Sequence, residues 1–221
     1  MLWNKLELPP AYYQDDAVYI IHGDCREILP LIPDKSIDLV LTDPPYKDDD
    51  VNGDYYEWFM GWWDLLKFND YAIHFNNSSR MYDLMQKLGK PYRILIWSKG
   101  VVKYAWRYEP IFIYSSTNPS FKINKYIYSD HLPYQPLHKG QSFHEYEKPH
   151  KLMRNIVSFI PQDKVTLDTF SGIGTTLVAA KTLGRKCIGI EIEEKYCEIA
   201  AKRCSQSVMK LEIPPLPVEY I

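Results

Sequence analysis

Cysteine is scarce in this 221-residue chain, which has only Cys25, Cys187, Cys197 and Cys204. The four form no C-x-x-C pair and no cluster with histidine at zinc-binding spacing, so the spacing suggests neither a metal site nor a disulfide framework. The six histidines are also scattered and do not converge in the sequence. We therefore predict no metal site and four reduced thiols packed in the core.

Long apolar runs and an excess of charge are missing as well. No run approaches the roughly 20 residues of a membrane span, and the start of the chain lacks a charged and then apolar signal pattern. We expect a protein that stays in the cytoplasm and has no membrane partner. A formal net charge of -2, from 26 basic and 28 acidic residues, excludes a protein that coats nucleic acid by bulk charge. The net charge does not exclude a local basic patch that binds nucleic acid.

Short β-branched runs alternate with helical periods along most of the chain, which is typical of an α/β domain. The pattern predicts strands at 17–22, 37–42, 71–75, 92–97, 110–115, 165–169 and 187–192. It predicts helices at 55–67, 78–89, 148–160, 175–183 and 193–204. No helix fits between 92–97 and 110–115, so these two strands should be antiparallel. We predict one domain, 1–221, built on a seven-stranded, mostly parallel sheet with one antiparallel strand and helices on both faces.

Two stretches break this alternation. Residues 116–146 are rich in Pro, Asn, Ser, Tyr and Lys without a clear period, and we interpret them as an inserted elaboration. Residues 205–221 form a tail that ends in the proline-rich LEIPPLPVEYI. The tail is expected to lie extended against the body or a partner, with disorder as the alternative.

The first candidate site is LTDPPYKDDD, residues 41–50, where an apolar strand runs into an acid, two prolines and a tyrosine. Each proline fixes its own φ and restricts the residue before it, so the turn after Leu41 is stiff. Asp-Pro and Pro-Pro pairs are also common in ordinary turns, which is the alternative reading. The acidic run 47–54 reads as a solvated loop beside this turn.

The second candidate is VTLDTFSGIGTTLVAAKTLG, residues 165–184, which joins a strand, a glycine-rich turn and a helix. It is not a phosphate loop, because no Lys-Ser or Lys-Thr follows the glycines, and Leu177 occupies the third glycine position of the dinucleotide fingerprint. A small adenosyl ligand fits better. Glu191 ends the next strand, where a ribose-binding acid sits in nucleotide-binding βαβ units. Alternatively, the glycines only permit tight packing and Glu191 is a solvated acid.

Six motifs make the sequence resemble the DNA amino-methyltransferases that use S-adenosylmethionine. They are HGDCREIL (22–29), DLVLTDPPY (38–46), RILIWSKG (93–100), EKPHKLMRNI (147–156), LDTFSGIGTTLVAAKTLGRK (167–186) and IGIEIEEKYCEIA (188–200). Their order is that of the permuted β class, in which the catalytic half precedes the cofactor half. The resemblance implies a Rossmann-like methyltransferase fold, S-adenosylmethionine as cofactor and DNA as substrate.

The resemblance also implies roles for individual residues. Asp43, Pro44, Pro45 and Tyr46 match the catalytic tetrapeptide. The residues implied at the cofactor are Asp24, Cys25, Lys148, Asp168, Phe170, Ser171, Gly172, Gly174, Thr175, Thr176 and Glu191, with Asp24 near the adenine, Glu191 at the ribose and Lys148 over the methionine end. Glu147 and Thr169 depart from the family pattern, where Gln and Pro are common.

The implied chemistry explains the stiff turn. The exocyclic amino group of adenine or cytosine is a poor nucleophile, because its lone pair is delocalised into the ring. The Asp43 carboxylate and the Pro44 carbonyl can accept its two N–H bonds, and the prolines keep these acceptors in place. Tyr46 is expected to stack on the base after the base has been flipped out of the duplex.

DNA contact is predicted from residues 99–151, which hold eight basic and four acidic residues. The DNA-binding candidates are Lys99, Lys103, Arg107, Lys122, Lys125 and Lys139. Tyrosines interleave with them, which suits phosphate contact plus base stacking, although half-buried strand tyrosines would give the same pattern. The resemblance implies that residues 116–146 hold the target specificity. Because this region is short, it suggests a short or relaxed site, or help from a second subunit.

Several alternatives remain open. Asp43 favours adenine N6, because family members that act on cytosine N4 more often carry Ser at that position. Methylation of RNA or of a protein glutamine, an inactive nucleic-acid-binding subunit and a nicotinamide oxidoreductase are the other readings. The sequence leaves open whether the chain forms a homodimer and whether a restriction endonuclease accompanies it.

Overall fold

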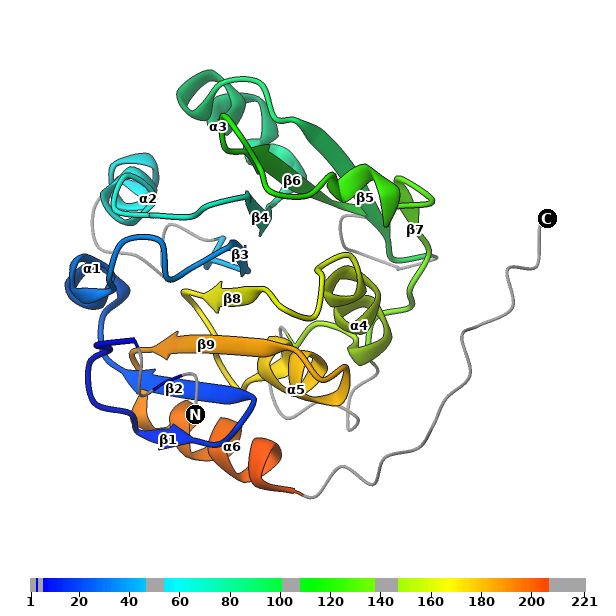
Figure 1. Ribbon diagram of the computed structural model, residues 1–221. Helices are drawn as coiled ribbons and strands as arrows, with labels where there is room; N and C mark the ends of the chain where they lie inside the picture. The colour runs from blue at the N-terminus through cyan, green and yellow to red at the C-terminus, as the bar shows by residue number, and fades with distance from the viewer. Residues whose placement is uncertain (1–2, 4–5, 47–53, 101–107, 138–146, 207–221) are drawn as a thin grey trace.

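A computed structural model describes residues 3, 6–46, 54–100, 108–137 and 147–206 of the chain. Residues 47–53 of the predicted acidic loop, the proline-rich tail and residues 138–146 of the inserted region fall outside them. A sheet runs through the described structure in the order β1-β2-β9-β8-β3-β4-β6-β5-β7 (Figure 1). Its strands are β1 (Tyr13–Gln14), β2 (Val18–His22), β3 (Leu39–Thr42), β4 (Tyr71–Phe75), β5 (Arg93–Ser98), β6 (Tyr108–Ser115), β7 (His131–Leu132), β8 (Val165–Asp168) and β9 (Lys186–Glu191).

The sheet is mostly parallel, as predicted, but it has nine strands rather than seven. The two additional strands, β1 and β7, are two residues long and lie at the edges, where so short a pairing leaves no period in the sequence. A second antiparallel strand also appears, because β1 runs against β2, in addition to β6, which is antiparallel to both β4 and β5. The predicted antiparallel pairing of β5 with β6 is confirmed, and Ile94 lies opposite Phe112.

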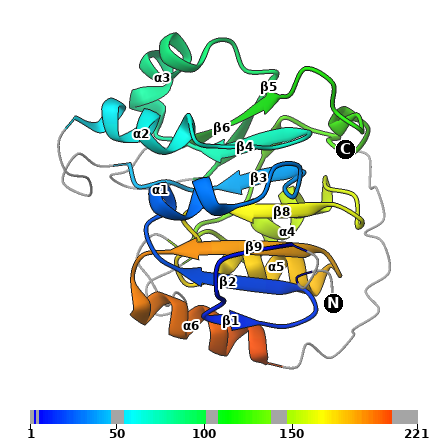
Figure 2. The ribbon, with the colours of Figure 1, turned by 60° about the vertical axis from the view of Figure 1, so that its left-hand side comes forward.

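Helices cover both faces of the sheet (Figures 1 and 2). They are α1 (Cys25–Ile28), α2 (Tyr55–Trp63), α3 (Met81–Leu88), α4 (His150–Ser158), α5 (Thr175–Thr182) and α6 (Glu194–Ser205). Leu39 and Leu41 of β3 belong to the core on the side of α4, α5 and α6, whereas Val40 belongs to the core on the side of α1, α2 and α3. Strands buried on both faces explain the continuous apolar runs of the sequence.

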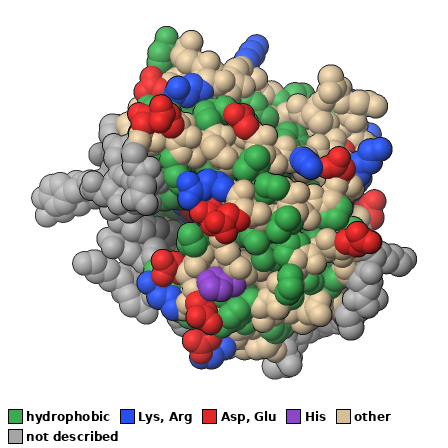
Figure 3. Space-filling view, turned by 90° about the vertical axis from the view of Figure 1, so that its left-hand side faces the viewer, with side chains coloured by type: hydrophobic (Ala, Val, Ile, Leu, Met, Phe, Trp, Pro, Cys, Tyr) green, Lys and Arg blue, Asp and Glu red, His purple; other side chains and the backbone are tan. Residues whose placement is uncertain are grey.

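The topology brings the two candidate motifs together. Strand β3 precedes the DPPY turn and pairs in parallel with β8, which precedes the glycine-rich turn, and Val40 lies opposite Leu167. The arrows of β2, β3 and β9 point to one side in Figure 2, so both turns leave the sheet at the same edge. Figure 3 faces the side toward which β8 and β9 point in Figure 1. On the described part of that face, basic and acidic side chains lie next to one another rather than forming a broad patch of one sign.

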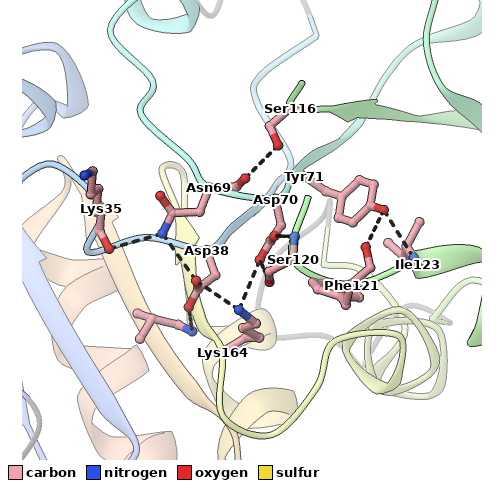
Figure 4. Close-up of polar contacts among 11 residues, drawn as sticks. Lys35, Asp38, Asn69, Asp70, Tyr71, Ser116, Ser120, Phe121, Ile123 and Lys164 are labelled. Carbon is pink, nitrogen blue, oxygen red and sulfur yellow. Dashed lines mark hydrogen bonds and ion pairs between the residues drawn. The ribbon is translucent and has the colours of Figure 1, made fainter. Parts of the chain in front are cut away.

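A polar network ties the opposite, amino-terminal ends of the strands (Figure 4). The Lys164 ammonium lies 3.4 Å from both the Asp38 and the Asp70 carboxylates, which precede β3 and β4. Asp70 is fully buried and also accepts hydrogen bonds from the backbone N–H and the hydroxyl of Ser120. The Tyr71 hydroxyl donates to the Phe121 carbonyl (2.8 Å). The first part of the inserted region is therefore anchored at the end of the sheet away from the two candidate turns.

Candidate active site

The DPPY turn is fixed to the glycine-rich turn by a buried hydrogen bond. Thr42, the last residue of β3, donates its hydroxyl to Asp168 Oδ1 at 2.9 Å, and its oxygen lies 3.0 Å from the Thr169 hydroxyl. All three side chains are at most 2% exposed. On the other side of the turn, Arg80 Nε donates to the Tyr46 carbonyl at 2.9 Å. Proline stiffness and these two bonds together hold Asp43 at the strand end.

Asp43 is the centre of a largely buried charge cluster. Its Oδ1 accepts a hydrogen bond from the Tyr46 hydroxyl (2.6 Å), and its Oδ2 lies 2.5 Å from the Lys148 ammonium. Burial raises the pKa of Asp43, the Lys148 charge acts against this, and the nearby Glu109 carboxylate adds to it. The pKa of Lys148 is raised as well, because its two carboxylate neighbours outweigh the cost of burial. Lys148 therefore stays cationic beside the predicted catalytic acid.

Glu109 completes this cluster, and the sequence analysis did not single it out. Its Oε2 lies 3.3 Å from the Tyr46 hydroxyl and 3.4 Å from the Lys148 ammonium, and its Oε1 pairs with the Lys99 ammonium. Glu109 lies near the start of β6, the antiparallel strand beside β4. A lone acid in the run RYEPIFIYS carries no local signal of such a role, so only the strand pairing reveals it.

The glycine-rich turn adopts the backbone conformation that its glycines predict. Gly172 and Gly174 have φ values of +50° and +80°, in the left-handed region that favours glycine. A Cβ at Gly174 would lie 2.8 Å from Ala200 Cβ, whereas a Cβ at Gly172 would meet nothing within 4 Å. Gly174 therefore permits α5 to pack against α6. Gly172 leaves a stretch of bare backbone that a ligand can approach.

Glu191 closes this turn at the end of β9. Its Oε2 accepts from the Gly172 backbone N–H at 2.7 Å, and its Oε1 accepts from the Glu193 N–H at 2.8 Å. The side chain is buried, and burial raises its pKa. Each carboxylate oxygen has a second lone pair, so Glu191 can still accept hydrogen bonds from a vicinal pair of hydroxyls.

A cavity lies between these elements and links both turns. It is lined by Gly23, Asp24, Cys25, Arg26, Pro45, Trp58, Thr169, Phe170, Ile190, Glu191 and Ile192. Asp24 caps α1 and pairs with Arg26, whose guanidinium lowers the pKa of Asp24. The Phe170 ring packs on Trp58, with 5.6 Å between the ring centroids. Aromatic rings, bare backbone and acidic groups suit an adenosyl ligand with a ribose and a sulfonium charge.

The family assignment follows from comparison with known proteins. A family model for N6 and N4 methyltransferases, described as a DNA methylase, matches residues 37–202. The chain belongs to this family. It is therefore an S-adenosylmethionine-dependent amino-methyltransferase of DNA, and the predicted resemblance is confirmed.

Individual relatives agree with this assignment. The type II methyltransferase M.HinfI from Haemophilus influenzae is 29% identical over 89% of this chain and 73% of its own length. The crystal structure of M1.HpyAVI with S-adenosylmethionine has a TM-score of 0.67 and 24% identity, and covers 85% of this chain and 99% of that one. The structure of the cytosine-N4-specific PvuII DNA methyltransferase has a TM-score of 0.71 and 18% identity, and covers 87% of this chain and 88% of that one. At this identity the structural likenesses show the fold.

The methylase structure brings most of the predicted site residues to one edge of the sheet. Asp24, Cys25, Phe170 and Glu191 line the cavity, as does Pro45. Ser171, Thr175 and Thr176 are buried in the turn and the start of α5. The Thr175 hydroxyl donates to Glu147 at 3.4 Å, and Asp168 accepts from the Phe170 N–H at 3.2 Å. Lys148, which the resemblance implies at the cofactor, pairs with Asp43, and its role at the cofactor stays a prediction.

Six residues that line the pocket were not among the predicted site residues, namely Gly23, Arg26, Trp58, Thr169, Ile190 and Ile192. Trp58 belongs to α2, which lies within the helix predicted at 55–67, and the sequence indicated no cofactor role for it. Its ring nevertheless reaches the cavity beside Phe170. Arg26 adjoins the predicted Asp24, and its pairing with that acid is visible only in the folded chain.

The predicted DNA-binding residues occupy different parts of the methylase. Lys99 lies in the catalytic charge cluster, where it pairs with Glu109. Lys122 precedes a short 3₁₀ helix, Ile123–Lys125, and Lys125 is its last residue. This helix lies at the amino-terminal edge of the sheet, where the Ile123 N–H donates to the Tyr71 hydroxyl. Lys103, Arg107 and Lys139 lie outside the described residues. Their roles in DNA binding stay predictions.

Two further findings concern the described ranges only. Within them, no cluster of three or more His, Cys, Asp or Glu side chains has the arrangement of a metal site. Among the helices of this part of the chain, none has the length and apolar character that crossing a membrane requires. The four cysteines are buried free thiols, as predicted.

Proposed function

We propose that this methylase acts on the N6 amino group of adenine in duplex DNA. One observation carries the proposal, namely that the Asp43 carboxylate is held by Tyr46 and Lys148 just beyond the end of β3, the strand that pairs with β8 before the glycine-rich turn. Asp rather than Ser at position 43 favours adenine over cytosine. Cytosine N4 is the alternative target, with the same acceptors.

In this mechanism Asp43 and the Pro44 carbonyl accept the two amino N–H bonds of a flipped base. This draws the amino nitrogen toward a tetrahedral geometry and frees its lone pair for attack. Both Asp43 oxygens already hold a donor, Tyr46 or Lys148, but each oxygen keeps a second lone pair for the base. Asp43 must be ionised for this role, which the adjacent Lys148 charge favours.

The cavity beside the turn is proposed to hold the cofactor, which when bound supplies the electrophilic methyl group. Glu191 would accept hydrogen bonds from the ribose hydroxyls and Asp24 would lie at the adenine. Phe170 and Trp58 would provide apolar surface for the adenosyl moiety. Asp168, Ser171, Gly172, Gly174, Thr175 and Thr176 would shape the turn that the cofactor contacts.

We also propose that 1–221 acts as one catalytic domain, with 116–146 contributing target recognition. The anchoring of Ser120 and Phe121 to Asp70 and Tyr71 gives the start of this region a fixed place. Base flipping into the pocket and stacking on Tyr46 belong to the same proposal. A second copy of the chain and an accompanying restriction endonuclease are both compatible with it.

The test is transfer of a labelled methyl group from S-adenosylmethionine to mixed-sequence duplex DNA, followed by digestion to nucleosides. N6-methyladenine in the product is expected. N4-methylcytosine would correct the base and keep the mechanism. Cofactor binding without transfer to duplex or single-stranded DNA would overturn the proposed reaction.

A further inference from the structure

A closed set of polar contacts surrounds the catalytic carboxylate. Tyr46 and Lys148 each contact Asp43 on one side and Glu109 Oε2 on the other, at distances of 2.5–3.4 Å. Two carboxylates therefore share one ammonium and one hydroxyl. Lys99 pairs with the other oxygen of Glu109, so the cluster holds two acids and two bases.

Burial makes this balance necessary. The side chains of Lys148 and Glu109 are only 8% and 11% exposed, and the Asp43 side chain is 25% exposed. A buried charge without a partner costs several kcal/mol, so each member depends on its neighbours. Lys148 also lies 5.1 Å from the centroids of the Tyr46 and Phe75 rings, which leave its ammonium little water. If Glu109 lost its charge, Lys148 would have Asp43 as its one carboxylate partner in the cluster.

We infer that Glu109 is a positioning residue for methyl transfer, which holds the Lys148 ammonium between two carboxylates so that Lys148 does not bind Asp43 too tightly and the Asp43 carboxylate stays free to accept the amino group. The inference rests on the proposed role of Asp43. Glu109 does not touch the base or the methyl group in this scheme. It sets how strongly Lys148 binds Asp43, because it competes for the same ammonium.

The charges that face Asp43 come from several elements. Lys148 precedes α4, Glu109 belongs to β6, and Asp168 ends the neighbouring strand β8. Glu109 raises the pKa of Asp43, whereas Lys148 lowers it. The acidic limb of the pH–rate profile for methyl transfer reports the ionisation of Asp43, because the proposed mechanism needs the charged carboxylate as acceptor for one amino N–H. Removing either neighbour must therefore move this limb, in opposite directions.

The test compares Glu109→Gln with Lys148→Gln in single-turnover methyl transfer from S-adenosylmethionine to duplex DNA as a function of pH. For Glu109→Gln we expect a rate about 10-fold lower and an acidic limb moved to lower pH by about 0.5–1 unit. For Lys148→Gln we expect a larger rate loss, about 100-fold, and a limb moved to higher pH. The double variant should show a limb near that of the wild type.

A second readout is the carboxyl ¹³C NMR titration of Asp43 in the protein without DNA, assigned with Asp43→Asn. It should show the same opposite shifts, even where a variant is too slow to assay. Glu198→Gln is the matched control, because Glu198 pairs with Lys202 on the exposed surface of α6 at 2.6 Å. It should leave both the rate and the limb unchanged.

The outcomes separate this inference from the proposed function. An Asp43→Ala enzyme with full activity would overturn both. If Asp43→Ala is inactive while Glu109→Gln keeps the wild-type limb and the wild-type Asp43 titration, the role of Glu109 is refuted and the proposed function stands. A lower rate with an unmoved limb would show that Glu109 is only structural.

Discussion

The cofactor turn and the catalytic cluster lie at the same edge of the sheet, yet different forces hold them. The proposed cofactor turn and Glu191 span residues 168–191, and hydrogen bonds from backbone N–H groups fix them: Ser171 N–H donates to the Ile190 carbonyl, and Gly172 N–H donates to the Glu191 carboxylate. The catalytic cluster joins Asp43, Lys99, Glu109 and Lys148, from four separate segments, through side-chain charges.

This difference predicts how each region fails. A turn defined by backbone conformation is broken by an added Cβ. A cluster defined by charge tolerates changes of shape but responds to pH and to loss of a single partner. One protein thus combines a cofactor site that is built by steric fit with an acceptor site that is tuned by electrostatics.

The largest expected effect separates the two regions by function. Asp43→Ala should lower the methyl-transfer rate by at least about 100-fold, because it removes the charged acceptor, while cofactor affinity stays near that of the wild type. Glu191→Ala should have the opposite pattern, with a large loss of cofactor affinity and a smaller loss of the methyl-transfer rate at saturating cofactor. Calorimetric titration with S-adenosylmethionine and single-turnover assays measure both. Equal losses of affinity in the two variants would contradict the separation.

The second prediction concerns steric fit in the cofactor turn. Gly174→Ala should lower the free energy of unfolding by about 2–4 kcal/mol, because a positive φ is combined with a close approach to Ala200. Gly184 is the matched control, since it has φ +66° but open space around its Cβ position. Gly184→Ala should cost only about 1 kcal/mol. Urea unfolding of both variants checks the difference, and equal losses would show that backbone strain alone matters.

The third and smallest effect is a pH dependence at the junction of the two regions. Burial raises the pKa of Asp168 to about 6, well above its usual range in an unfolded chain. Between about pH 4 and 6 the folded protein therefore binds more protons than the unfolded chain, and stability falls as pH rises through this window. Asp168→Asn removes this dependence.

Relative to Asp168→Asn, the wild type should lose up to about 3 kcal/mol between pH 4 and 6 and change little above that range. Urea unfolding across this range measures the difference. Parallel stability curves for the two proteins would mean that Thr42 and the Phe170 N–H hold the carboxylate ionised.

Much of the fold could be predicted from the sequence. The strand predicted at 71–75 coincides with β4, and the helix predicted at 175–183 ends one residue beyond α5. These elements have strong periods, because both faces of the strand and one face of the helix are buried. The edge strands β1 and β7 were missed, since two paired residues leave no periodic signal.

For the site, the sequence by itself determined the cofactor turn and the DPPY turn. Glycine at positive φ and proline at fixed φ are properties of single residues, so they can be read locally. Only the tertiary structure decided that Glu109 and Lys99 join Asp43, and that Lys148 binds Asp43. Those contacts depend on the pairing of β6 beside β4 and on the placement of the segment before α4. Charges separated by tens of residues leave no local pattern, because their interaction depends on distance in space and on burial.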